Sequence, residues 1–141
     1  MNIPSHRIMS FNINGDYSGG ENSWEKRKPL NLEMINRYRP DLIGLQEGAR
    51  INLDTFRDEL SEFTVVEGNR YGDNPPEDYS SILYRTSRYD LLNKGEFWFS
   101  GTPDIESADW GVEYPMGAII IFVFSQKQSA SDSQNLRLQL S

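Results

Sequence analysis

The pattern of apolar and polar positions in the first half of the chain predicts two strands. Residues 7–13 carry apolar anchors at Ile8, Phe11 and Ile13, which predicts one strand. The second strand is predicted over residues 41–46, because Leu-Ile-Gly-Leu is an unbroken apolar run without polar alternation. A run of this kind is typical of a strand that is buried on both faces.

An amphipathic segment separates these strands and predicts a helix within residues 24–38. Leu30, Met34 and Tyr38 recur at four-residue spacing, so we expect them to form one apolar stripe that faces a sheet. Pro29 fits best at the first helical position, which would leave the residues before it as a turn.

The chain continues with a second short helix and several strands. We predict the helix over residues 52–60, with Asn52 as its N-cap, because an asparagine side chain can accept from a free backbone N–H. The predicted strands cover residues 63–67, 80–85, 89–92, 95–99 and 117–124.

Two polar residues end the first two predicted strands. Glu47 follows the buried run, and Asn12 lies near the end of residues 7–13. Open α/β sheets bind ligands at the carboxyl ends of their strands, so both residues are candidates for a site. The plainer interpretation of Glu47 on this pattern alone is a solvated turn residue.

The order of these features resembles the opening of the endonuclease/exonuclease/phosphatase family, whose members are metal-dependent phosphoesterases. The resemblance lies in a strand that ends Phe-Asn, a polar loop followed by Trp24 and Arg27, a helix, Pro-Asp, and a strand that ends Leu-Gln-Glu. It implies that Asn12 and Glu47 are catalytic residues and that both contribute to a metal site, with Glu47 as a direct ligand. The implied cofactor is Mg²⁺ or Mn²⁺, weakly bound if at all.

The resemblance extends to about residue 119. Asp78-Tyr79-Ser80-Ser81-Ile82-Leu83-Tyr84 is similar to an acidic-Tyr-x-x-Ile-x-Tyr strand of the family, and Phe-Trp-Phe-Ser-Gly-Thr-Pro at 97–103 is similar to its Phe-Trp-Leu-Ser-Glu-Thr-Pro stretch. Asp78, Trp98 and Trp110 are therefore candidates for the wall of a substrate pocket. As aromatic residues, the two tryptophans are more often plain core.

The family's later motifs do not occur in this chain. An Asn-Thr-His strand, a Gly-Asp-x-Asn loop and a terminal Asp-His pair are all absent, and the one histidine, His6, precedes the first strand. We expect His6 to be an exposed terminal residue. Phosphoester hydrolysis needs an activated water and an acid for the leaving group, so we expect a truncated chain that is weakly active or inactive alone.

The composition indicates which kinds of partner and which location to expect. The formal net charge is −7, and the one basic run, residues 26–28, is best interpreted as a solvated helix start, so no strong nucleic-acid patch is expected. The chain has no cysteine, no apolar leader and no apolar run of membrane-spanning length, which predicts a cytoplasmic protein without a membrane partner.

We predict an α/β fold, a mixed β-sheet with helices on one face, that is about half of a four-layer α-β-β-α sandwich. Residues 1–124 should form an endonuclease/exonuclease/phosphatase-like domain and residues 125–141 a low-complexity polar tail. The predicted function is hydrolysis of a phosphate ester. One alternative is a non-catalytic interaction module that uses an exposed sheet face. Another is a complete enzyme of different chemistry built on Glu47, Asp78 and Asp104.

The segment Ala118–Phe124 raises a further expectation. It is uncharged, lacks proline and glycine, and is rich in β-branched and aromatic residues, which is typical of an aggregation-prone strand. Alternation would place Ile119, Ile121 and Val123 on one face and Ile120, Phe122 and Phe124 on the other. Helices can cover one face, so we expect self-association through the other.

Overall fold

The computed structural model describes residues 5–71 and 78–125, with the side chains of 69–71, 78 and 79 outside the description. The expected polar tail therefore falls almost wholly outside the described residues. The elements are β1 (Ile8–Asn12), the 3₁₀ turn η1 (Gly20–Asn22), α1 (Trp24–Tyr38), β2 (Leu42–Ala49), α2 (Arg50–Glu59), β3 (Phe63–Tyr71), β4 (Asp78–Arg85), β5 (Tyr89–Trp98) and β6 (Gly117–Ser125). Within the described part, no helix is long and apolar enough to cross a membrane.

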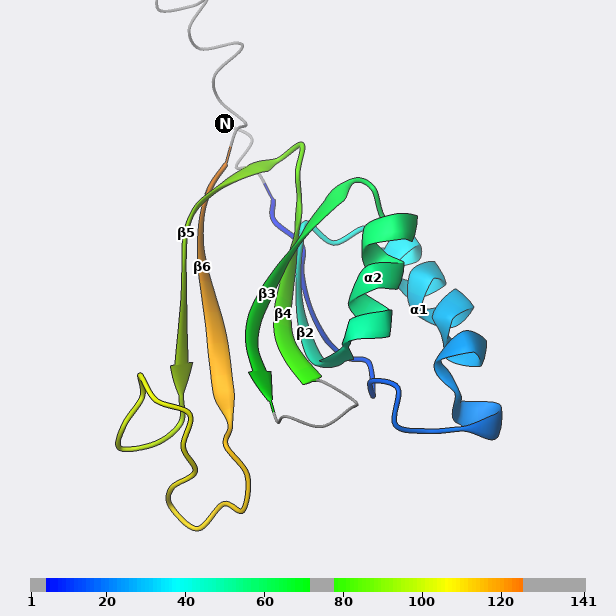
Figure 1. Ribbon diagram of the computed structural model, residues 1–141. Coiled ribbons are helices and arrows are strands. Elements are labelled where there is room, and N and C mark those ends of the chain that lie inside the picture. The colour runs from blue at the N-terminus through cyan, green and yellow to red at the C-terminus, as the bar shows by residue number, and fades with distance from the viewer. Residues whose placement is uncertain (1–4, 72–77, 126–141) are drawn as a thin grey trace, which may run out of the picture.

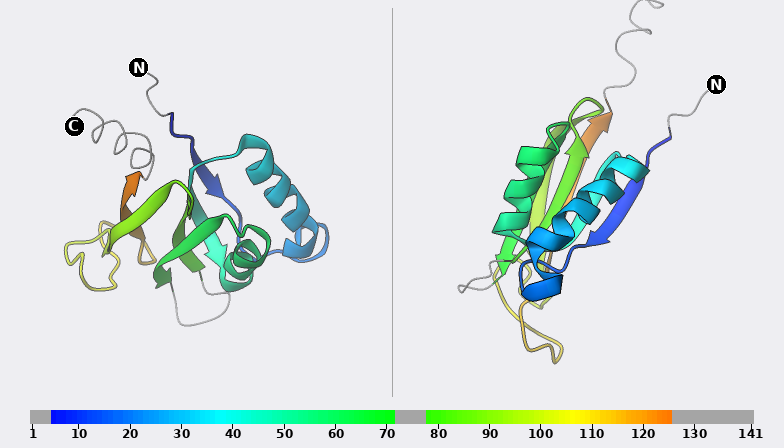
Figure 2. Two further views of the ribbon diagram at one scale, coloured as in Figure 1. Left: turned by 90° about the horizontal axis from the view of Figure 1, so that it is seen from above. Right: turned by 90° about the vertical axis from the view of Figure 1, so that its right-hand side faces the viewer.

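The strands form two sheets. The first has the order β1-β2-β4-β3, in which β1 and β2 are parallel and the other pairs are antiparallel; β5 and β6 form a separate antiparallel hairpin. Figure 1 and Figure 2 show both helices on one face of the first sheet and the hairpin on the other. The predicted α/β fold with helices on one face is confirmed, and the hairpin adds a further layer.

The main core lies between the first sheet and the helices. Its members are apolar side chains from one face of the sheet and from the inner sides of α1 and α2. They are Ile13, Trp24, Ile35, Ile43, Leu45, Leu53, Phe56, Leu60, Phe63 and Leu83. The rings of Trp24 and Phe56 pack edge to face with their centroids 5.8 Å apart, and the Trp24 indole N–H donates to Thr55 Oγ1 at 3.1 Å. These contacts join the first turn of α1 to α2.

A smaller core joins the two sheets. Val66, Tyr84 and Tyr89 are buried there, and Ile119, Ile121 and Val123 of β6 pack against them. A Cβ on Gly68 would lie 2.6 Å from the Ser80 carbonyl oxygen and 2.8 Å from Ile119 Cβ, so only a glycine fits where Ile119 of β6 packs on β3. The predicted alternation along β6 is correct, but a sheet covers its inner face where helices were expected.

Helix α1 differs from the prediction in its start and in its buried face. It begins at Trp24, so Pro29 lies inside it, and its buried side chains are Trp24, Asn31 and Ile35. The predicted stripe is largely exposed, with Leu30 at 63%. Burial of Trp24 fixes the rotation of the helix about its axis. Pro29 cannot donate a backbone hydrogen bond to the carbonyl four residues earlier, so the packing of Trp24 and Ile35 must offset the cost of a proline inside the helix.

Other boundaries differ in smaller ways. Helix α2 begins at Arg50, so Asn52 is not its N-cap; the Asn52 side chain reaches back to accept from the Ala49 N–H at 2.8 Å. The Asn52 side chain is also fully buried. The two strands predicted over 89–99 are one strand, β5, because a register shift between Leu91 and Asn93 absorbs the break in alternation.

A buried ion pair fixes the end of the first sheet where β1 and β2 begin. Asp41 is 3% exposed, accepts from the Arg7 N–H at 2.8 Å, and forms an ion pair with Arg88. Burial by itself would raise the pKa of Asp41, but the hydrogen bond from Arg7 and the contact with Arg88 together lower it below its ordinary value of 3.8. Asp41 is therefore charged in the folded protein.

We expect Asp41→Asn to lower the free energy of unfolding at pH 7 by about 3 kcal/mol, because Arg88 would stay mostly buried without its counter-charge. A group whose folded pKa is lowered stabilises the fold above its ordinary pKa, and that stabilisation is lost as the pH falls through the folded value. The difference between wild type and Asp41→Asn should therefore shrink below about pH 4. Urea unfolding at pH 7 and pH 3 measures both. Exposed Asp58→Asn is the matched control, and an equal effect of the two substitutions would contradict the expectation.

The outward face of β6 leads to a second prediction, which concerns self-association. Ile120, Phe122 and Phe124 are 44%, 57% and 61% exposed. Three large apolar side chains on one strand face form a patch of the kind that binds other proteins or aggregates. We expect the wild-type chain to self-associate and Phe122→Glu to shift it toward monomer. Light scattering after size exclusion reports the mass, with exposed Leu30→Glu on α1 as control. A wild-type monomer at high micromolar concentration would contradict this expectation.

Candidate functional site

The candidate site lies where β1 and β2 end. The two strands run parallel, with Ile8 beside Leu42 at one end and Asn12 beside Gln46 at the other. Figure 1 shows these carboxyl ends beside the start of α2. The position of both predicted site residues at one edge of the sheet follows from this parallel pairing.

A β-bulge shapes the end of β2. Leu45 pairs with Ser81 and Gly48 pairs with Tyr79, so Gln46 and Glu47 together oppose a single residue of β4. The backbone of Glu47 has a φ of 55°, in the left-handed region that residues other than glycine rarely adopt. The conformation costs about 1–2 kcal/mol. A bulge turns a side chain out of the regular alternation, and here it turns that of Glu47.

Asn12 holds the Glu47 carboxylate. The Asn12 amide nitrogen donates to Glu47 Oε1 at 2.8 Å, and its oxygen accepts from the Asn14 N–H at 2.9 Å. The reversed amide would point oxygen at a carboxylate and N–H at N–H, so this network fixes the orientation. In this geometry Asn12 positions the Glu47 carboxylate, and its oxygen keeps a second lone pair.

Backbone contacts join the site to the loop after β1. The Gly15 N–H donates to the Glu47 carbonyl oxygen at 2.7 Å, and the Ile13 N–H donates to the Gln46 carbonyl oxygen at 3.1 Å. The left-handed backbone of Glu47 is thus stabilised from the neighbouring strand. The loop and the bulge therefore form one unit.

Arg27 organises that loop. Its guanidinium donates to the carbonyl oxygens of Ile13, Asn14 and Gly15, and its Nε donates to the Asn22 carbonyl oxygen. The interpretation of residues 26–28 as a solvated helix start is therefore wrong for Arg27. Five N–H donors on one planar group match a loop whose carbonyls converge, and this role has no signal in the periodicity of the helix.

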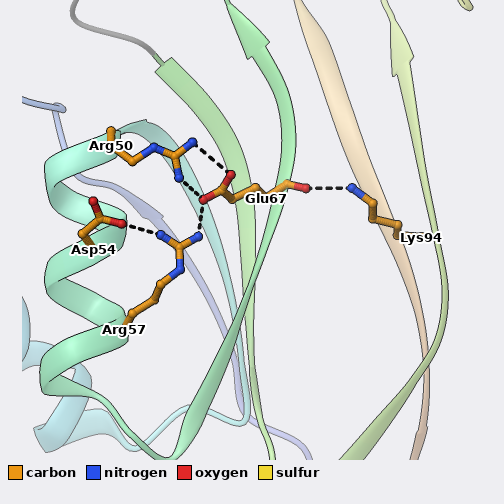
Figure 3. A network of polar contacts seen from close by, with 5 residues as sticks. All are labelled: Arg50, Asp54, Arg57, Glu67 and Lys94. Atoms are coloured by element: carbon orange, nitrogen blue, oxygen red, sulfur yellow. Dashed lines mark hydrogen bonds and ion pairs between the residues drawn. The ribbon is translucent and has the colours of Figure 1, made fainter.

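A charged network on β3, which lies beyond β4 in the same sheet, supports the start of α2. Figure 3 shows Arg50 and Arg57 of α2 on the Glu67 carboxylate, while Lys94 of β5 donates to the Glu67 carbonyl oxygen at 3.2 Å. Arg57 also pairs with Asp54 at 2.6 Å. Burial favours a raised pKa for Glu67, but the hydrogen bonds and charges of Arg50 and Arg57 outweigh it and lower the pKa. An ionised Glu67 therefore links α2, β3 and β5.

The predicted pocket residues are distributed differently. Trp98 is 8% exposed at the end of β5 and belongs to the interior, whereas Trp110 is 72% exposed in the connection 99–116. Asp78 begins β4 opposite Ala49, and its side chain lies outside the described residues. Figure 1 places this connection at the same end of the molecule as the carboxyl ends of β1 and β2.

The donor set for a metal is small. Among the residues that the structure describes, no three acidic or histidine side chains gather in a group that could hold a metal ion. His6 contacts the Tyr89 hydroxyl beside the start of β1, away from Glu47. Mg²⁺ binds through one or two carboxylates and keeps several waters, so Glu47 fits as a single ligand of a weakly held ion.

Known proteins resemble this chain in sequence over part of its length and in structure over most of it. No model of a protein family matches the sequence. The uncharacterized protein L388 of Acanthamoeba polyphaga mimivirus is 30% identical over 98 residues, which cover 62% of this chain and 34% of that protein. The chain therefore spans about a third of this relative's length.

Solved structures match more of the chain. A mannosyl-6-phosphatase from Bacteroides thetaiotaomicron VPI-5482 has a TM-score of 0.78 and 26% identity over 88% of this chain and 48% of its own. An endonuclease/exonuclease/phosphatase family protein from Bacteroides thetaiotaomicron has a TM-score of 0.77 and 26% identity over 87% of this chain and 46% of its own. The chain thus spans about half the length of the solved structures that it matches. By fold and by sequence pattern it is similar to proteins of the endonuclease/exonuclease/phosphatase family, and it matches about half of that fold.

Proposed function

We propose that the chain carries part of the active site of a divalent-metal-dependent phosphoesterase. The observation that carries the proposal is the Asn12–Glu47 pair, held at 2.8 Å at the carboxyl ends of two parallel strands. The strain at Glu47 adds support, because left-handed backbone at a residue other than glycine is concentrated at functional sites. The likeness to a phosphatase over 88% of this chain supports a phosphate ester as substrate.

In this proposal Glu47 binds Mg²⁺ or Mn²⁺, and Asn12 orients the carboxylate. A bound divalent ion would neutralise charge on the phosphate oxygens and lower the pKa of a metal-bound water. The Gly15 N–H and the Arg27 contacts keep the loop beside the pair in place. The cytoplasmic location predicted from the cysteine-free composition stays a prediction.

The described chain supplies only one side of this chemistry. Its carboxylate and amide account for metal binding, but its one histidine, a common general base, lies on Tyr89 and away from this edge of the sheet. Effects of catalytic groups that act together are strongly non-additive, so loss of one removes most of the rate. We therefore propose metal binding with very low turnover for these 141 residues by themselves.

The second candidate function is a non-catalytic interaction module. The observation that favours it is the outward face of β6, where Phe122 and Phe124 are more than half exposed. A partner that covers this face would bury apolar surface at about 25 cal/mol per Å². This function and metal binding at Glu47 use different surfaces, so variants in each surface separate them.

Glu47→Gln should abolish the binding of Mn²⁺, which we expect at millimolar affinity in the wild type because only one carboxylate is available. Titration calorimetry with Mn²⁺ measures it. Exposed Glu33→Gln makes the same chemical change on α1 and is the control. Asn12→Ala should weaken binding by less than Glu47→Gln, because it leaves the carboxylate present but free to move. Equal Mn²⁺ affinity in wild type and Glu47→Gln would exclude Glu47 as a ligand.

The proposal also predicts the rate at which the chain hydrolyses phosphate esters. Hydrolysis of p-nitrophenyl phosphate and of bis-p-nitrophenyl phosphate with Mg²⁺ or Mn²⁺ should stay near the rate without protein, because the one histidine lies on Tyr89 and not beside Glu47. Absorbance of p-nitrophenolate measures it, with Glu47→Gln as the reference for contaminating activity. Robust turnover that disappears in Glu47→Gln would show that the residues present suffice for catalysis.

A further inference from the structure

A pocket rich in arginine lies at the end of the first sheet that is remote from Glu47. It has a volume of about 430 Å³ and is lined by Arg7, Arg39, Arg85, Arg88, Asp41 and Ser87, among others. Asp41 precedes β2 and Glu47 lies near its end, so about six residues of strand, or ~20 Å, separate the two regions. Figure 1 shows the start of β1, the connection from α1 to β2 and the turn between β4 and β5 together at this end.

The charge of this pocket contrasts with the rest of the chain. Four arginines and one aspartate give its lining a formal charge of 4 − 1 = +3, whereas the whole chain is −7. Asp41 does not leave an open negative charge, because Arg88 and the Arg7 N–H already occupy its carboxylate. The Glu62 carboxylate oxygen Oε1 lies 3.7 Å from the Arg85 guanidinium nitrogen Nη1 and offsets part of the charge of Arg85. The remaining excess is positive.

The four arginines differ in how much of their hydrogen-bonding capacity the fold uses. Arg85 donates to the Pro40 carbonyl oxygen and stacks over Phe63 at 4.6 Å, and Arg88 bonds Asp41 and the Ser5 carbonyl oxygen. These two have structural roles. The Arg88 Nε atom is nevertheless buried without a partner in the described structure, and a buried unpaired donor needs an explanation.

Arg7 and Arg39 keep most of their donors available. The Arg7 guanidinium makes one long contact, to the Tyr38 carbonyl oxygen at 3.4 Å. Arg39 has no side-chain partner in the described part of the chain. Its backbone ends α1 with a φ of 48°, a position where glycine is the favoured residue. A basic side chain is favourable at a helix C-terminus, and here it also adds a fourth guanidinium to the lining of the pocket.

We propose that this pocket binds the phosphate or pyrophosphate group of a small phosphorylated molecule. Guanidinium groups match phosphate oxygens in planar, two-point hydrogen bonds, and several around one concavity compensate the two or more negative charges of such a group. A volume of about 430 Å³ is within the range of small-molecule sites. This pocket is separate from the metal site proposed at Glu47 and does not depend on it.

Titration calorimetry with inorganic pyrophosphate at pH 7.5, in 50 mM NaCl and without divalent metal, tests the proposal. We expect saturable one-to-one binding that Arg39→Gln and Arg7→Gln each weaken at least fivefold. Arg37→Gln, an exposed residue two positions from Arg39, removes the same charge outside the pocket and should change the affinity less than twofold. Glu47→Gln should leave it unchanged. Thermal unfolding of each variant checks that the fold is retained.

The opposite results are equally definite. No saturation by 5 mM pyrophosphate, or equal weakening by Arg37→Gln and Arg39→Gln, would overturn the proposal. A parallel titration with an eight-nucleotide single-stranded DNA distinguishes the source of the phosphate. Weaker binding of the oligonucleotide than of pyrophosphate supports a small phosphorylated ligand. Tighter oligonucleotide binding that is lost in Arg39→Gln would overturn the small-molecule assignment in favour of a nucleic-acid strand.

Discussion

The left-handed backbone of Glu47 is the constraint on which the candidate site depends. Strand β2 must leave its regular ladder with β4 after Leu45, because two of its residues then oppose one. The same departure turns the Glu47 side chain toward Asn12 and its carbonyl oxygen toward the Gly15 N–H. The conformation that costs energy locally is thus also the one that joins β1, its following loop and β2. A glycine at this position would relieve the strain and would remove the carboxylate.

A second bulge at the same level of the sheet repeats this geometry on the other side of β4. Glu67 pairs with Ser81 and Arg70 with Tyr79, so β3 also inserts an extra residue opposite Ser80. The two bulges twist both neighbours of β4 at one level. Gly68 lies in the second bulge, where the hairpin approaches through Ile119, and Glu67 beside it holds the start of α2 through Arg50. Helix α2 begins directly after the bulge of Glu47, so the Arg50–Glu67 contact joins the two bulges across β4.

Sequence patterns predicted the parts of the fold that depend on local order, and they failed where distant packing decides. The second strand was predictable because Pro40 ends a helix and an unbroken apolar run follows it, although β2 continues past the predicted end at Gln46 to Ala49 through the bulge. The buried face of α1 was not, because four-residue spacing fits Leu30, Met34 and Tyr38 as well as any stripe, and burial of Trp24 against Phe56 chose another. The cover of β6 was missed for the same reason, since alternation indicates which side chains share a face and not what packs on it. The contacts of Arg27 with three converging carbonyls depend on a loop conformation that no spacing encodes.

The two ends of the first sheet differ in charge, and the net charge of the chain does not show this difference. One end presents Glu47, and the other gathers four of the chain's 14 basic residues around Asp41. Parallel pairing of β1 and β2 creates both ends at once: the residues that precede the strands, Arg7 and Asp41, must meet at one end if Asn12 and Glu47 meet at the other. The antiparallel return of β4 then brings Arg85 and Arg88 to the Asp41 end. A net charge of −7 argues against binding a long polyanion over the whole surface, and it leaves open a compact site for one anion where the topology concentrates arginine.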